Sequence, residues 1–124
     1  MKSILIIDDE VEILSILSFR LENWGYKAIK SDNGHDALVK IYNDKPDLVL
    51  LDIMMPVMDG FEVLEKIKEK EETKRIPIIV VSVVVSKKEV EKSISLGANY
   101  YINKPYDAHD LKNKISMLIG EGEK

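Results

Sequence analysis

The sequence Leu48-Val49-Leu50-Leu51-Asp52 stands near the middle of the chain. Four consecutive apolar residues without polar alternation are typical of a parallel strand that is buried on both faces of a sheet. Two similar runs, Ile4-Leu5-Ile6-Ile7 and Ile78-Ile79-Val80-Val81, lie on either side of it along the chain. Residues 26–30 and 100–103 alternate more between apolar and polar, which predicts two flanking strands.

Amphipathic segments separate these runs. The periodicity predicts helices over residues 10–24, 33–43, 59–71, 87–96 and 108–119. Gly25 and Gly97 stand where helix C-terminal caps are expected, Ser86 and Glu89 have capping-box spacing, and Asp107 is a candidate N-cap. Five strand–helix units with right-handed crossovers predict an α/β fold, a flavodoxin-like (βα)5 doubly wound parallel sheet with strand order 2-1-3-4-5.

The length and composition fit one small domain. A chain of 124 residues with 45% hydrophobic and 32% charged residues is expected to build one core, here over residues 1–119, followed by a flexible polar tail at 120–124. Zero cysteines exclude a disulfide scaffold, a thiolate metal site and a cysteine nucleophile.

Charge and hydropathy narrow the expected partners. The formal net charge of -4 argues against direct nucleic-acid binding. The longest apolar stretch, residues 76–85, is too short to span a membrane, and no signal peptide is recognised before residue 4. We therefore expect a cytoplasmic monomer that binds neither nucleic acid nor membrane.

Polar side chains follow four of the predicted strands. Asp8-Asp9-Glu10 follows the first, Asp52 the third, Ser82 ends the fourth, and Lys104-Pro105 follows the fifth. In the order 2-1-3-4-5 these strands are consecutive neighbours, about 4.8 Å apart. The four side-chain groups are therefore predicted to converge on one pocket at the carboxyl edge of the sheet.

The three aspartates of this pocket predict a cation site. Two unit charges about 4 Å apart repel by roughly 4 kcal/mol at an effective dielectric of 20, so Asp8, Asp9 and Asp52 require a raised pKa or a cation. An all-oxygen site with few protein ligands favours Mg²⁺, and the spacing matches no Ca²⁺ loop.

Asp52 is the carboxylate best placed to act as a nucleophile, because it ends a buried strand and begins a loop. A carboxylate can attack phosphorus and form an acyl phosphate. Ser82 could donate a hydrogen bond to the phosphoryl group, and Lys104 could supply a positive charge. Each residue alone has an ordinary structural explanation as a cap or a turn residue, but four neighbouring strand ends together indicate a phosphoryl-receiving pocket.

With these residues in place, the sequence resembles a response-regulator receiver domain of two-component signalling, similar to chemotaxis regulators. The resemblance runs from residue 4 to about residue 119. It is carried by the segments 8–10, 50–56, 58–64, 97–98 and 104–106 and by Ser82.

The resemblance implies a role for each pocket residue. Asp52 would be the phosphoacceptor, and Asp8 and Asp9 would hold Mg²⁺ with Asp52 and the backbone carbonyl of Met54. Ser82 and Lys104 would bind the phosphoryl group, and Tyr101 would be the aromatic switch residue. The lysine–proline bond before residue 105 would be cis.

The same resemblance implies partners and an output. The donor would be a phosphohistidine on a sensor histidine kinase or a histidine phosphotransfer domain, and helix 4, strand 5 and helix 5 would form the surface that switches. Receivers that dimerise through that surface carry acids before the switch aromatic and an arginine on helix 5. Here Asn99, Tyr100 and Lys114 stand at those positions, so no strong phospho-dimer is expected.

Two positions depart from the family pattern. Val83 replaces the usual alanine after Ser82, and Val57 replaces a common glycine after Met-Pro, which makes a different turn possible. Met54 and Val84 stand at the positions that line the approach of the hydrolysing water, and neither binds water strongly. The phosphorylated state is therefore expected to be long-lived.

The first helix carries more apolar residues than one interface needs. Leu14, Leu17 and Leu21 form the stripe that packs on the sheet. Ile13, Ile16 and Phe19 lie mostly outside it and, with Pro105 and Tyr106, are predicted to form the surface on which the kinase docks. The alternative is that these three residues pack on helix 5.

Three other functions compete with the receiver. An aspartate-nucleophile Mg²⁺ phosphatase would need Asp-x-Asp after the first strand, whereas this chain has adjacent acids there. A flavin-binding module would need a Ser/Thr/Gly-rich loop in place of the acids. A protein adaptor that has lost phosphorylation is the third alternative, which Val83 keeps open.

Overall fold

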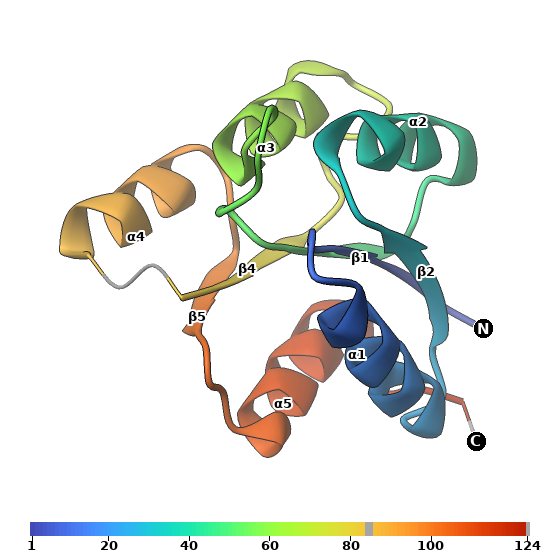
Figure 1. Ribbon diagram of the computed structural model, residues 1–124. Helices are drawn as coiled ribbons and strands as arrows, with labels where there is room; N and C mark the ends of the chain where they lie inside the picture. Colours follow the sequence, from blue (N-terminus) through green and yellow to red (C-terminus); the bar gives the residue numbers. More distant parts are fainter. Residues whose placement is uncertain (84–85, 124) are drawn as a thin grey trace.

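The computed structural model describes residues 1–83 and 86–123. Five strands and five helices alternate along the chain (Figure 1). They are β1 (Ser3–Ile7), α1 (Val11–Asn23), β2 (Lys27–Ser31), α2 (Gly34–Asp44), β3 (Leu48–Leu51), α3 (Gly60–Glu69), β4 (Ile78–Ser82), α4 (Lys87–Ser95), β5 (Tyr100–Asn103) and α5 (Ala108–Ile119).

The strands form one parallel sheet in the order β2-β1-β3-β4-β5, which confirms the predicted topology. Ile7 pairs with Leu51, and Ser82 pairs with Asn103. The residues that follow these pairs therefore emerge side by side at the carboxyl edge of the sheet.

The helix ends were predicted to within one or two residues, and three of the helix starts differ for the same reason. The predicted helices over 10–24, 33–43 and 59–71 each began on what is the N-cap residue: Glu10, Asn33 and Asp59 have extended backbone. The side chain of Asn33 accepts a hydrogen bond from the amide of Asp36, and Asp59 accepts one from Glu62. A cap residue shares the helix's polar pattern but not its dihedral angles.

The other predicted caps are present. Gly25 and Gly97 end their helices with φ of 90° and 112°, where a side chain would be strained. The Ser86 hydroxyl accepts from the Glu89 amide at 3.2 Å, which is the N-cap bond, and it donates to the Glu89 carboxylate at 2.9 Å.

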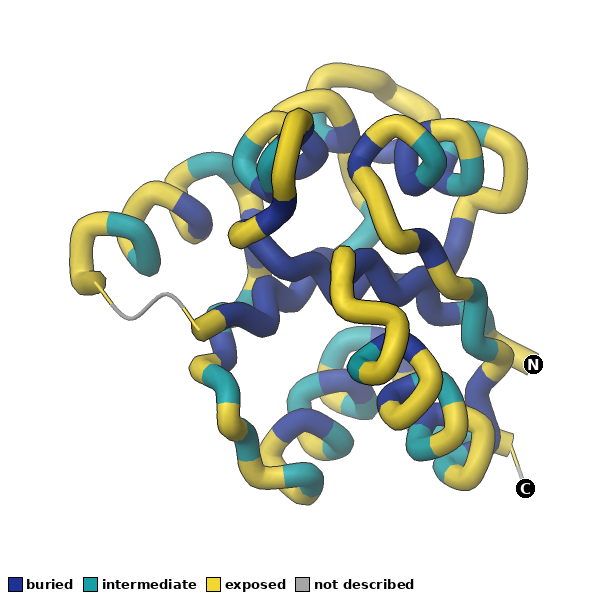
Figure 2. Tube along the Cα trace, in the orientation of Figure 1, coloured by how far each residue is buried: buried dark blue, intermediate teal, exposed yellow. Residues whose placement is uncertain are grey.

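The sheet separates two hydrophobic cores (Figure 2). One core lies under α2 and α3 and includes Leu51, Val63 and Ile67. The other lies under α1 and α5 and includes Leu17, Leu50 and Ile115. Helix α4 stands at the margin of the molecule in Figure 1, and Ser93 is its one fully buried residue in the described part of the chain.

No helix within the described ranges is long and apolar enough to cross a membrane.

Candidate functional site

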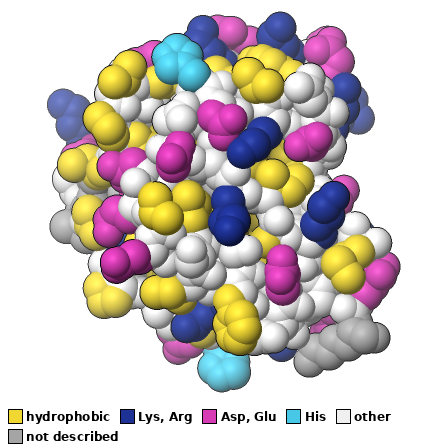
Figure 3. All heavy atoms as spheres, turned by 45° about the vertical axis from the view of Figure 1, so that its right-hand side comes forward, with side chains coloured by type: hydrophobic (Ala, Val, Ile, Leu, Met, Phe, Trp, Pro, Cys, Tyr) yellow, Lys and Arg dark blue, Asp and Glu magenta, His cyan; other side chains and the backbone are white. Residues whose placement is uncertain are grey.

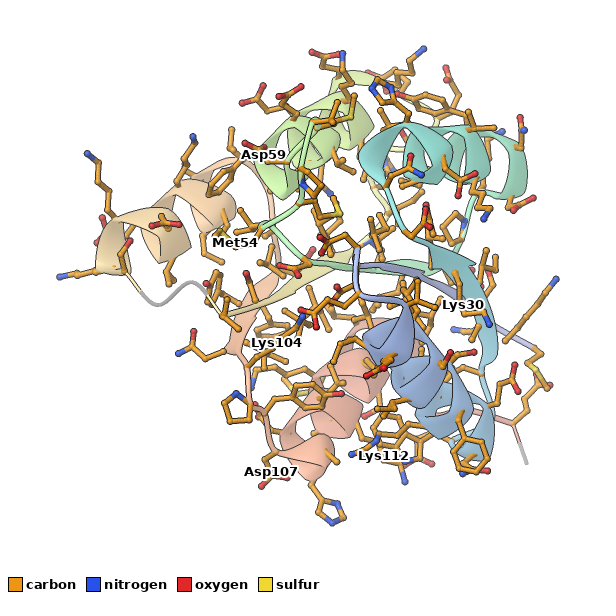
Figure 4. The ribbon with its side chains drawn as sticks, viewed as in Figure 1. Lys30, Met54, Asp59, Lys104, Asp107 and Lys112 are labelled. Atoms are coloured by element: carbon orange, nitrogen blue, oxygen red, sulfur yellow. The ribbon has the colours of Figure 1, made fainter. Side chains whose placement is uncertain are left out.

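The carboxyl ends of β1, β3 and β4 and the loop after β5 meet at one edge of the sheet. The Asp52 amide donates to the Ile7 carbonyl at 2.9 Å, and the Lys104 amide donates to the Ser82 carbonyl at 2.9 Å. The backbone hydrogen bonds of the sheet thus continue into the site and hold its four groups together. Figure 4 shows Lys104 and Met54 at this edge.

The three predicted aspartates form a cluster. One carboxylate oxygen from each of Asp8, Asp9 and Asp52 lies within 4.8 Å of the others. Asp8 and Asp52 are buried, whereas Asp9 is exposed. Oxygen donors at this spacing suit a hard divalent cation such as Mg²⁺, so the residues present fit the predicted ion.

Each buried carboxylate is also fixed by the loop that follows it. The Asp8 Oδ1 atom accepts a hydrogen bond from the Glu10 amide at 2.9 Å, and the Asp52 Oδ1 atom accepts one from the Met54 amide at 3.0 Å. These bonds orient both side chains before any ligand binds.

Lys104 supplies a positive charge between two of the acids. Its Nζ atom lies 2.6 Å from Asp8 Oδ2 and 3.3 Å from Asp52 Oδ2. Burial alone would lower the pKa of Lys104, but the hydrogen bond to Asp8 and the charges of Asp52 and Asp8 outweigh it and raise that pKa. The ammonium ion therefore offsets part of the carboxylate repulsion.

The peptide bond between Lys104 and Pro105 is cis, as predicted.

Ser82 and Tyr101 lie on the α3–α4 side of the site. The buried Ser82 hydroxyl donates to Asp52 Oδ1 at 2.9 Å. The Tyr101 hydroxyl is shielded from solvent and has no hydrogen-bond partner within the described ranges. Burial raises the pKa of Tyr101, and the charges of Glu89 and Asp52 raise it further.

The loop between β3 and α3 contains two backbone features that bear on Asp52. Val57 has φ of 68° and is 93% exposed, so it adopts the left-handed turn conformation in which glycine is common. A Cβ on Gly60 would lie 2.5 Å from the Asp52 carbonyl oxygen and 2.6 Å from Ile53 Cα. Helix α3 can approach the end of β3 this closely only because residue 60 lacks a side chain.

The close approach of Gly60 to the end of β3 was not predicted from the sequence. A glycine in the first turn of a predicted helix, directly after an N-cap candidate, is the signal that could have indicated the close approach. Val84, at a position predicted to line the approach of water, lies outside the described residues.

The predicted docking residues surround a groove of about 460 Å³. It is lined by Ile13, Ile16, Pro105 and Tyr106 together with Glu10, Arg20, Val83 and Lys104. Phe19 is not among the lining residues and lies on the adjoining surface of α1. Ile16 and Phe19 are 55% and 70% exposed, so these two side chains are not buried against α5, whereas Ile13 is half-buried.

Comparison with known proteins agrees with this geometry. A family model described as the response regulator receiver domain matches residues 4–116. This chain belongs to that family. Receiver domains are signalling phosphoacceptors of two-component systems, they typically bind Mg²⁺ at an acidic pocket, and they interact with histidine kinases or phosphotransfer partners.

This receiver domain is 31% identical over 122 residues to the alkaline phosphatase synthesis transcriptional regulatory protein PhoP of Bacillus subtilis (strain 168). The match covers 98% of this chain and 50% of PhoP, so the chain spans about half the length of that relative.

Solved structures share the same fold. The signal receiver domain of the DNA binding response regulator merR from Colwellia psychrerythraea 34H is 34% identical with a TM-score of 0.90, and the match covers 96% of this receiver domain and 98% of that chain. The signal receiver domain of a histidine kinase from Syntrophus aciditrophicus is 28% identical with a TM-score of 0.88, covering 96% and 90%.

Proposed function

We propose that this receiver domain accepts a phosphoryl group on Asp52 from a phosphohistidine of a sensor histidine kinase or a histidine phosphotransfer domain. The arrangement that supports the proposal is a buried carboxylate, Asp52, whose two oxygens face a hydroxyl donor and an ammonium ion. An Asp52 oxygen bonds to phosphorus while the phosphorus–nitrogen bond breaks, and the imidazole leaves with the electron pair and takes up a proton.

The surrounding residues stabilise the transferred group. Lys104 already bridges Asp8 and Asp52, and its ammonium ion can pair with a phosphoryl oxygen next to Asp52. The Ser82 hydroxyl can turn from Asp52 Oδ1 to another phosphoryl oxygen. Asp8, Asp9 and Asp52, with the Met54 backbone carbonyl, would hold Mg²⁺, which when bound supplies charge that offsets the negative charge on the phosphoryl oxygens.

The phosphoryl group would also change the surface over α4, β5 and α5. A phosphoryl group adds about 1.5 to 2 negative charges, and drawing Ser82 toward it opens space beside the half-buried Tyr101 ring. Helix α4 is suited to move, because it buries so little of its surface. We infer that Tyr101 and α4 respond together.

The decisive experiment is phosphorylation by acetyl phosphate with Mg²⁺, read by intact mass. The parent protein should gain one phosphate, and Asp52→Asn should gain none. Asp59→Asn is a matched control, since Asp59 is an N-cap in the same loop and asparagine caps equally well. It should phosphorylate like the parent. No mass gain in the parent would favour the alternative function, a protein adaptor that has lost phosphorylation.

The metal assignment has its own test. Asp9→Asn should weaken Mg²⁺ binding about tenfold, measured by isothermal titration calorimetry, because one of the three clustered carboxylates loses its charge. The remote Asp44→Asn should leave binding unchanged. Removal of a like charge should also raise the metal-free free energy of unfolding, by up to about 1 kcal/mol. Equal Mg²⁺ affinity in parent and Asp9→Asn would contradict the site.

We further propose that the donor docks on Ile13, Ile16, Phe19, Pro105 and Tyr106. Ile16→Ala should weaken binding of the phosphodonor protein about tenfold, since a buried aliphatic side chain contributes about 1.5 to 3 kcal/mol. Its phosphorylation by acetyl phosphate should stay close to that of the parent. Equal losses with both donors would show that Ile16 acts on the pocket and not on docking.

The remaining expectations depend on this role. We infer that residues 1–119 form the phosphate-accepting domain and that the protein acts as a cytoplasmic monomer.

A further inference from the structure

Two glycines that are far apart in the chain, Gly25 and Gly122, meet in backbone contact. A Cβ on Gly25 would lie 2.0 Å from the Glu123 carbonyl oxygen, and a Cβ on Gly122 would lie 1.9 Å from the Trp24 carbonyl oxygen. Real Cβ atoms essentially never approach within 3.0 Å of another heavy atom. The contact therefore requires glycine at both positions.

Hydrogen bonds hold residues 120–123, the tail segment, in this place. The Glu123 amide donates to the Gly25 carbonyl at 2.9 Å, and the buried Tyr26 hydroxyl donates to the Gly120 carbonyl at 2.7 Å. Lys2 Nζ donates to the Ile119 carbonyl, and the Met1 amine lies 3.5 Å from a Glu123 carboxylate oxygen. Figure 1 shows both ends of the chain beside β2 and the end of α1.

The tail segment joins two helices that share one core. Gly25 and Tyr26 follow the last turn of α1, and Gly120 follows the last residue of α5. The other end of α1 carries Ile13 and Ile16, which form one wall of the docking groove, while Pro105 and Tyr106 lead into α5 and form the other.

We propose that the tail segment is a strap that fixes the distance between α1 and α5 and thereby the width of the docking groove. The inference rests on the proposed docking function. Helix α1 is about 20 Å long, at 1.5 Å for each of its 13 residues. Because the strap ties the C-terminal end of α1 to the segment that follows α5, it restrains how the two helices shift against each other across their shared core. The strap takes no part in the chemistry at Asp52.

The absence of cysteine from the chain allows a direct measurement of this distance. Spin labels on Glu12→Cys and His109→Cys report the distance between α1 and α5, and both positions are exposed. The parent should give one narrow distance distribution by double electron–electron resonance. Gly122→Ala, whose added methyl group collides with Trp24, should broaden or shift it.

Controls distinguish an effect on the strap from an effect on the Asp52 pocket or on folding as a whole. Glu121→Ala, an exposed change in the same segment, should keep the narrow distribution. Amide exchange at Glu123 should become at least tenfold faster in Gly122→Ala, and phosphate uptake from acetyl phosphate should stay within twofold of the parent. If neither the parent nor the variant takes up phosphate, the proposed phosphoacceptor function is wrong. The distance measurement still tests the strap in that case, because it does not depend on phosphorylation.

The proposal is overturned if Glu123 exchanges rapidly in Gly122→Ala while the distance distribution stays that of the parent. Should Gly122→Ala fail to fold, Tyr26→Phe replaces it, because it removes the hydroxyl bond to Gly120 and keeps the ring. That variant should speed Glu123 exchange and broaden the distribution to a smaller extent. If Glu123 exchanges faster in Tyr26→Phe while the distance distribution stays that of the parent, the strap proposal is overturned as well.

Discussion

The left-handed backbone of Val57 is a local cost in the loop between β3 and α3. The left-handed conformation costs a residue with a side chain roughly 1 to 2 kcal/mol, and the 93% exposed Val57 side chain gains little packing in return. Val57→Gly should therefore raise the free energy of unfolding by about 0.5 to 1 kcal/mol, after the greater chain entropy of unfolded glycine is deducted.

Urea unfolding at constant m-value would measure this gain. Val57→Ala serves as the control and should gain less, because alanine keeps the Cβ atom. A loss of stability in Val57→Gly would mean that the valine side chain makes a contact worth more than the backbone strain.

Asp36 links stability to pH. Hydrogen bonds from Lys40 and Ser31 lower the pKa of Asp36, so the ionised form stabilises the fold. This contribution is fully present above the unfolded pKa, near 4, and is lost as the pH falls through the lower folded pKa. Asp36→Asn should therefore be less stable than the parent at pH 7, by about 0.5 kcal/mol for a partly exposed pair, with the difference vanishing near pH 2.

Thermal unfolding across this pH range tests the direction. The control Asp44→Asn should show no such trend. A stability difference that grows as the pH falls would reverse the assignment.

At the scale of elements, α3 and the Asp52 strand are held together through Gly60. Gly60→Ala places a Cβ against the Asp52 carbonyl and must push α3 or the loop away. The expected results are a loss of about 1 to 3 kcal/mol in the free energy of unfolding and phosphorylation by acetyl phosphate that is slower by about tenfold or more.

Gly34→Ala is the matched control for this prediction. Its added Cβ would meet the Met58 side chain, which can move, and not the backbone of the site. It should cost some stability and leave the phosphorylation rate near that of the parent. Equal rates in Gly60→Ala and the parent would show that α3 does not position Asp52.

The sequence pattern predicted the sheet and the pocket because both depend on local signals. Buried parallel strands appear as unbroken apolar runs, and the residue after each run must emerge at the carboxyl edge, so Asp8, Asp52 and Lys104 could be placed together. The ion pair of Lys104 with Asp8 could not be predicted, since either acid could have accepted it. The contact between Gly25 and Gly122 could not be predicted either. The sequence indicates only a helix cap at Gly25 and a polar tail at Gly122, because contacts between remote backbone segments leave no periodic signal.

At the scale of the whole molecule, the surface argues against self-association through α4, β5 and α5. Lys114 is already paired with Asp110 on its own helix at 2.5 Å. The face that Figure 3 brings forward is the side of β2 and not that of α4, and acidic and basic side chains are interspersed over it. The phosphorylated protein should therefore sediment as a monomer in analytical ultracentrifugation at micromolar concentration, as should Asp52→Asn treated in the same way. A dimer that forms only after phosphorylation would refute this expectation.

The two hydrophobic cores have a consequence for how such a molecule can diversify. Leu50 and Leu51 are neighbours in the chain, yet each belongs to a different core. The helix proposed to choose the donor, α1, rests on one core, while α3 and Tyr101, the proposed switch residue, pack against the other. Substitutions on α1 that retune recognition of a donor can therefore accumulate while the packing of α3 and Tyr101 across the sheet stays intact, whereas α5 shares the core of α1 and must adapt with it.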